Sequence, residues 1–172
     1  LKGASYSNKS CGCAIFLSNK FTLQQIKRVE LPPEALRGRG GLIRVVRPDA
    51  DISPGVAYFP PPPRYEYEKQ SWSKAVTKLA RWMTTTTKTL PTNTTPIWFL
   101  DLNSGVGIRA GINDTDDYVG SYGNAEQTLA ADCIREMLVA TDMVLINSFA
   151  PTGPIFLLNP RQKVKDRLHR NT

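Results

Sequence analysis

Short apolar runs along the chain predict β-strands. Each run is rich in β-branched or aromatic residues and is bounded by Pro, Gly, Asn or Asp. The predicted strands are Cys11–Leu17, Gly41–Val46, Gly55–Phe59, Ile97–Leu102 and Met143–Phe149. Pro60–Pro63 follows the third of them, and a run of prolines cannot continue a central strand. We therefore expect this stretch to leave the sheet, either as a stiff surface connection or as a ligand of the SH3 type.

Between the later strands, two segments repeat apolar residues at the spacing of a helix. Trp72–Met83 carries apolar residues at i, i+3, i+4 and i+7, which predicts one buried face. We expect Thr84–Thr87 to fray the end of this helix, because β-branched residues propagate helices poorly. Leu129–Leu138 has the same spacing, and Asn124 with Gln127 ahead of it is similar to a capping box.

The order strand, strand, strand, helix, strand, helix, strand predicts an α/β or α+β domain in which helices pack on sheet. The length agrees with one domain, because 172 residues are enough to bury a real core. No apolar run reaches the length of a membrane-spanning helix, so we expect no membrane partner. The chain begins with Leu1 rather than Met, which suggests a fragment or a processed product.

Basic residues outnumber acidic ones. The chain has 22 Lys and Arg against 15 Asp and Glu, a net charge of +7. This balance excludes an acidic linker and suits a nucleic-acid substrate without requiring one. Much of the excess lies in the C-terminal tail, at Arg161, Lys163, Lys165, Arg167 and Arg170. The tail either lies in solvent or binds phosphates with salt-sensitive affinity.

The cysteine and histidine counts exclude several kinds of site. Cys11, Cys13 and Cys133 are too few for a disulfide framework, and we interpret them as small buried hydrophobic residues in a reducing compartment. That usage is the basis of our guess that the protein is nuclear or cytoplasmic. His169, the only histidine, lies in the polar tail. A closed zinc site and most nucleophile–histidine–acid arrangements are therefore not expected.

The most informative segment for chemistry is Thr95–Gly107, in which an apolar strand runs into Asp101 and Asn103. Ligands bind at the carboxyl ends of strands in α/β sheets. Alternation along the strand places both side chains on one side, where a carboxylate and an amide can hold a metal-bound water or a phosphate oxygen. The alternative is an Asx turn that simply ends the strand.

Six segments of the chain follow one another in the order of a known family. One is the segment with Asp101 and Asn103, and the others are Gly12–Phe21, Leu36–Val46, Gly55–Pro63, Val119–Phe149 and Thr152–Phe156. Together they resemble the endonuclease/exonuclease/phosphatase superfamily, nearest to the endonuclease domains of non-LTR retrotransposons. The segment with Asp101 and Asn103 resembles the Gly-Asp-Phe-Asn motif of that family, with Leu100 and Leu102 in place of Gly and Phe. The resemblance implies a partial domain of this superfamily over residues 11–158, with a leader remnant at 1–10 and a basic tail at 159–172.

The resemblance implies a layered sandwich of β-sheets flanked by helices, and a metal-dependent hydrolase of DNA phosphodiester bonds. Asp101 would orient or deprotonate the attacking water, and Asn103 would hydrogen-bond the phosphate. Tyr58 would donate to a phosphate oxygen or, as a phenolate, activate the nucleophile. Mg²⁺ or Mn²⁺ would be held by Asp101 and Asn103. Arg37, Arg39 and Asn124 would contact nucleic acid. A reverse transcriptase domain in the same parent polyprotein is the implied partner.

The chain also departs from the family pattern. The metal-binding Glu expected before the first strand is absent, because residues 1–10 contain no acid, and the terminal Ser-Asp-His is absent too. We therefore expect an incomplete domain with impaired catalysis. Two alternatives stay open: a basic remnant that binds nucleic acid without cutting it, and a phosphatase of the same superfamily.

Overall fold

A computed structural model of the chain describes residues 12–106, 117–121, 128–149 and 156–158. The strands are β1 (Ile26–Glu30), β2 (Gly40–Arg47), β3 (Ala50–Tyr58), β4 (Thr95–Asp101), β5 (Val144–Leu145) and β6 (Phe156–Leu158), and the helices are α1 (Lys69–Lys88) and α2 (Leu129–Thr141). The strands form one sheet in the order β1-β2-β3-β4-β6-β5. Only the β3–β4 pair is parallel.

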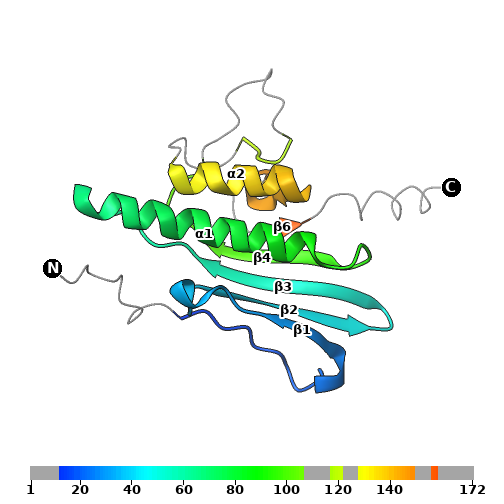
Figure 1. Cartoon of the computed structure of the whole chain (residues 1–172). Helices are drawn as coiled ribbons and strands as arrows, with labels where there is room; N and C mark the ends of the chain where they lie inside the picture. The colour runs from blue at the N-terminus through cyan, green and yellow to red at the C-terminus, as the bar shows by residue number, and fades with distance from the viewer. Residues whose placement is uncertain (1–11, 107–116, 122–127, 150–155, 159–172) are drawn as a thin grey trace.

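Both helices lie on the same face of this mixed sheet (Figure 1). The structure is therefore α+β, as the element order predicts. The described residues hold a single sheet, so the second sheet of the expected sandwich is not among them. Helix α1 connects the parallel strands β3 and β4 as a crossover, which is the usual way to join two parallel neighbours.

The core lies between the helices and the inner face of the sheet. Val76, Leu79 and Met83 of α1 are fully buried, in agreement with the apolar spacing of the sequence. They share one buried cluster with Trp98 of β4, which has no exposed surface. Trp98 lies beside Gly55 of β3, and a Cβ at that glycine would stand 2.6 Å from the indole ring. The core therefore depends on a large and a small residue on neighbouring strands.

The prediction that Thr84–Thr87 frays the first helix is wrong, because α1 continues to Lys88. Tertiary contacts overcome the weak helix propensity of the threonines. Thr86 and Thr87 are buried, and the Thr87 hydroxyl accepts a 3.0 Å hydrogen bond from the Trp98 indole. The Thr84 hydroxyl donates to the Ala80 carbonyl at 2.9 Å, within the helix itself.

The predicted strand Cys11–Leu17 is also wrong for the residues that the structure describes. Residues 12–18 have no strand pairing, although exposure alternates along them as the sequence suggests. The place beside β2 is taken by β1, which pairs antiparallel with it. Strand β1 was not predicted, because Lys27, Arg28 and Glu30 obscure its apolar alternation.

Only part of the predicted strand Met143–Phe149 forms. Strand β5 ends at Leu145, and a 3₁₀ turn covers Ile146–Phe149. Buried Ser148 explains the change, since its hydroxyl donates to the Leu145 carbonyl and accepts from the Gly120 amide, both at 2.6 Å. Such local side-chain hydrogen bonds compete with strand pairing.

The other element predictions agree with the structure. Pro60–Pro63 leaves the sheet after β3 without regular structure. Helix α2 begins after Thr128, whose hydroxyl accepts from the Ala131 amide at 3.4 Å. The capping pair predicted from Asn124 and Gln127 lies outside the described residues. Cys133 is buried as expected, and this burial raises the pKa of its thiol.

Candidate functional site

Tyr58 and Asp101 lie side by side at the carboxyl ends of β3 and β4. They are register partners in the parallel pair, and the Phe59 amide donates to the Asp101 carbonyl at 2.8 Å. Their neighbours Ala57 and Leu100 are buried beneath the helices. Because side chains alternate across a sheet, Tyr58 and Asp101 project from the opposite face, which the helices leave open.

These two side chains line one hollow of about 340 Å³. Val56 and Phe99, two residues back along the same strands, form its floor, and residues 12–14 form another wall. The Cys13 amide donates to the Gly38 carbonyl at 3.1 Å, which ties this wall to the loop before β2. Strand alternation indicates that Val56 and Phe99 share a face with Tyr58 and Asp101. No feature of the sequence indicates that residues 12–14 lie beside them.

Asp101 and Asn103 do not continue the strand alternation that is expected from their spacing. Strand β4 ends at Asp101, and Asn103 has a positive φ of 49°. The Asp101 Oδ1 accepts from the Asn103 amide at 3.1 Å, which is an Asx turn. The Asn103 side chain donates to the Phe59 carbonyl at 2.8 Å and so links the ends of the two strands. The Asx turn that was the alternative interpretation is therefore present. The Asp101 side chain nevertheless stays exposed at the hollow.

Arg39 completes a row of three side chains across the sheet. It lies one residue before the Gly40–Ala57 pair, and its carbonyl accepts from the Tyr58 amide at 2.8 Å. Its guanidinium carbon lies 5.7 Å from the centre of the Tyr58 ring, a cation–π contact. The row thus runs Arg39, Tyr58, Asp101 over the ends of three neighbouring strands.

Arg39 is 5% exposed, and within the described part of the chain its Nη1 is buried with no hydrogen-bond partner. No carboxylate pairs with it among the described salt bridges. A buried charge of this kind is costly unless an opposite charge and hydrogen bonds compensate it. An anionic ligand with oxygen acceptors would supply both, but Arg39 does not line the hollow, so the residues that cover its Nη1 would have to move aside for such a ligand to reach it.

Arg37, the other arginine predicted to contact nucleic acid, lies in solvent. Its nearest partner is Glu34, at 3.4 Å, and both side chains are mostly exposed. Gly38 separates it from Arg39 with a φ of 83°, a backbone conformation that glycine adopts without strain. This turn places the two arginines in different environments. Asn124 and the basic tail lie outside the described residues.

The predicted metal ligands, Asp101 and Asn103, lie together at the end of β4. Mg²⁺ prefers one or two carboxylates together with water and phosphate oxygens. Asp101 offers a carboxylate, and Asn103 uses its side-chain Nδ2 to donate to the Phe59 carbonyl, which leaves Oδ1 as the atom that would bind a metal. Over residues 12–106, 117–121, 128–149 and 156–158, no three His, Cys, Asp or Glu side chains are grouped as a metal site. A magnesium site at Asp101 therefore stays a prediction.

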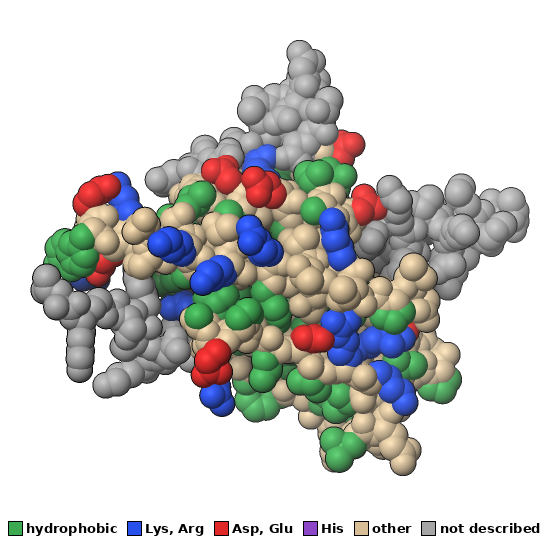
Figure 2. All heavy atoms as spheres, in the orientation of Figure 1, with side chains coloured by type: hydrophobic (Ala, Val, Ile, Leu, Met, Phe, Trp, Pro, Cys, Tyr) green, Lys and Arg blue, Asp and Glu red, His purple; other side chains and the backbone are tan. Residues whose placement is uncertain are grey.

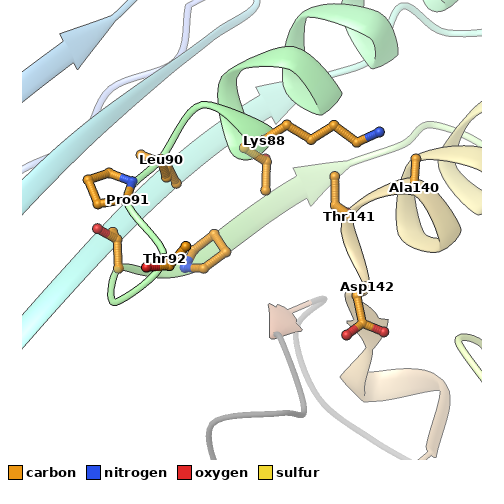
Figure 3. A pocket seen from close by; sticks show the side chains of 10 residues that line it. Lys88, Leu90, Pro91, Thr92, Ala140, Thr141 and Asp142 are labelled. Carbon is orange, nitrogen blue, oxygen red and sulfur yellow. The ribbon is translucent and has the colours of Figure 1, made fainter.

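A second hollow, of about 270 Å³, lies at the other end of the sheet. It is lined by the last residues of α1 and α2 and by the start of β4. Figure 3 shows Lys88 reaching from α1 toward Ala140 and Thr141 of α2. Helix α1 runs antiparallel to the parallel strands it joins, so this hollow is remote from Tyr58 and Asp101.

None of the described helices is both long and apolar enough to cross a lipid bilayer. Comparison with the models of known protein families gives no match. A search of curated proteins gives no match either.

Proposed function

We propose that this chain is an endonuclease-like domain that binds the phosphodiester backbone of DNA at the row Arg39, Tyr58 and Asp101. The observation that carries the proposal is the buried guanidinium of Arg39, which has no acidic partner within the described residues and stacks on Tyr58. A phosphate is the anion whose oxygens best match the donors of an arginine.

Each residue of the row has a distinct task in this proposal. Arg39 neutralises the phosphate and donates to a non-bridging oxygen. The Tyr58 hydroxyl donates to a second oxygen of the same group. Asp101 accepts a proton from the attacking water as the new P–O bond forms and the bridging P–O bond breaks, and the released alkoxide takes a proton from solvent water. Asn103 acts indirectly, because it ties the end of β4 to Phe59.

Hydrolysis is expected to be slow. In-line attack on a phosphodiester usually needs divalent metal to neutralise the developing charge. The family resemblance implies Mg²⁺ or Mn²⁺, and Asp101 would be the protein ligand. Asp101 would be the one carboxylate of such a site. We therefore expect DNA binding by this chain to be easier to detect than DNA cleavage.

The first test is DNA binding by the full chain. Arg39→Gln should weaken the affinity for a labelled duplex by about tenfold to a hundredfold, because it removes charged hydrogen bonds to phosphate. Arg81→Gln is the matched control, since Arg81 is exposed on α1 and loses the same charge. Fluorescence anisotropy at rising salt concentrations measures both. Equal losses in the two variants would contradict the proposal.

Thermal unfolding of the same variants separates a binding role from a structural one. Arg39→Gln removes a buried Nη1 that has no hydrogen-bond partner, and the cation–π contact with Tyr58 that is lost with it is worth only about 0.5–2 kcal/mol, so the melting temperature should fall little. A large loss of stability would instead mark Arg39 as part of the core.

A nicking assay on supercoiled plasmid with Mg²⁺ tests the catalytic part. Slow nicking that Asp101→Asn abolishes supports an impaired endonuclease. Binding that depends on Arg39 without any nicking supports the second candidate, a nucleic-acid-binding domain without catalysis. The lack of a three-residue metal group in the described part of the chain favours this second candidate. Nicking that survives Asp101→Asn would remove Asp101 from the site.

A further inference from the structure

The connection between β3 and α1 carries a sequence that neither the fold nor the phosphate site explains. It reads Pro60-Pro61-Pro62-Pro63-Arg64-Tyr65, and a second tyrosine, Tyr67, follows. In Figure 1 this connection lies at the end of the molecule where α1 begins. Consecutive prolines favour the polyproline II conformation, which has no internal hydrogen bonds and leaves the backbone open to a partner.

The first proline belongs to the fold. Pro60 is buried, and its carbonyl accepts a 2.9 Å hydrogen bond from the Trp72 indole at the start of α1. A polyproline II helix has three residues per turn, so Pro60 and Pro63 share one ridge. Because Pro60 is buried, the Pro60–Pro63 ridge is not available to an SH3-type groove, which reads prolines three apart.

The following residues are presented to solvent. Pro61, Pro62 and Arg64 are exposed, Pro63 is half-buried, and Tyr65 is 59% exposed. The backbone of Tyr65 is extended, with φ −122° and ψ 144°. Pro62 and Tyr65 are three residues apart, and the chain bends at Arg64 and Tyr65 before the 3₁₀ turn begins.

Tyr65 is also held in place. Its ring stacks on that of Tyr67, with 5.5 Å between ring centres and 9° between planes. The segment is anchored on both sides, by the Trp72–Pro60 hydrogen bond before it and by a 3₁₀ turn at Glu66–Glu68 after it. A segment that is already ordered loses less conformational entropy when a partner binds it.

We propose that Pro61–Tyr65 is a docking segment for a small β-domain of the WW type, whose aromatic-lined groove binds polyproline II ligands. The exposed prolines pack against aromatic rings of that groove, and Tyr65, presented by the bend that follows them, occupies a second pocket. Arg64, which lies between them, is exposed, and any residue at this position would allow the same binding. This inference does not depend on the proposed DNA-binding function.

The test uses the full chain and a purified WW domain that selects a Pro-Pro-x-Tyr ligand. Tyr65→Ala should weaken the affinity at least about tenfold in a calorimetric titration, because it empties one of the two pockets. Tyr67→Ala is the comparison: it removes a more exposed tyrosine that lies outside the Pro-Pro-x-Tyr spacing, and it should cost less affinity than Tyr65→Ala, because it removes only the ring on which Tyr65 stacks. Pro62→Ala should weaken binding like Tyr65→Ala.

Three results would overturn the inference. The first is no binding by the full chain when a synthetic peptide of residues 59–67 does bind, since the fold would then hide the segment. The second is an equal loss in Tyr65→Ala and Tyr67→Ala. The third is binding to an SH3 domain that survives Tyr65→Ala, which would mean that the prolines are read in another way. DNA binding by Tyr65→Ala should equal that of the unchanged chain.

Discussion

At the residue scale, Gly55 and Trp98 show how one missing side chain makes room for the largest one in the core. The two residues are register partners on β3 and β4. The Trp98 ring covers Gly55, and it also meets Trp82 of α1 edge-on at 5.5 Å between ring centres. The contact of helix and sheet therefore depends on Gly55 having no Cβ.

Gly55→Ala should lower the free energy of unfolding by about 1–3 kcal/mol, because the new methyl group forces Trp98 out of its position. Gly12→Ala is the control, since nothing lies within 4 Å of a Cβ built there. Urea unfolding followed by tryptophan fluorescence measures both variants. Equal stabilities would show that the Trp98 ring can move without cost.

The row Arg39, Tyr58 and Asp101 also belongs to this scale. The family resemblance selected all three residues and placed Tyr58 and Asp101 in one site, whereas Arg39 was expected only as a contact to nucleic acid. The stacking of Arg39 on Tyr58 and the burial of its Nη1 could not be read from the sequence, because both depend on how β2 meets β3 and on residues 12–14 nearby.

At the element scale, α1 shows tertiary contacts overriding local preference. Its apolar spacing predicts the buried face, whereas the four threonines at its end argue for fraying. The hydrogen bond from Trp98 to Thr87 keeps the last turn helical. The partner of Thr87 is on another element, so no local rule reveals it.

Thr87→Val should destabilise the protein by about 1–3 kcal/mol, because valine has the same shape but leaves the buried Trp98 indole N–H without an acceptor. Thr85→Val is the matched control, since Thr85 is exposed on the same turn. Thermal unfolding with far-UV circular dichroism reports both stability and helix content. An unchanged melting temperature for Thr87→Val would mean that the indole finds another acceptor.

At the scale of the whole molecule, an ion pair between β2 and β3 also binds the loop after α1. The Arg44 guanidinium donates twice to the Asp51 carboxylate, at 2.9 and 2.5 Å, from β2 to β3. Asn93, in the loop before β4, donates to the same carboxylate at 3.1 Å. The hydrogen bonds from Arg44 hold the pKa of Asp51 below its ordinary value.

This pair makes stability depend on pH. A carboxylate whose pKa is lowered by folding stabilises the native state above its unfolded pKa, which is about 4, and loses that contribution as the pH falls through its folded pKa. Asp51→Asn should therefore be less stable than the unchanged chain at neutral pH, and the difference should shrink below about pH 4. Asp49→Asn is the control, because Asp49 pairs with Arg47 and both side chains are exposed. A difference that stays constant from neutral to acidic pH would contradict this prediction.

Hydrophobic spacing was enough to identify most of the strands, both helices, the class of fold and the exit of Pro60–Pro63 from the sheet. Those features depend on periodicity and on backbone restrictions, which act over a few neighbouring residues. The tertiary structure decided the rest: β1 as an edge strand while residues 12–18 form no strand, the Ser148 turn that shortens β5, and the position of Arg39 beside Tyr58 and Asp101. Each of these features depends on which segments, distant along the chain, pair with one another. Local patterns in a single sequence do not determine that pairing.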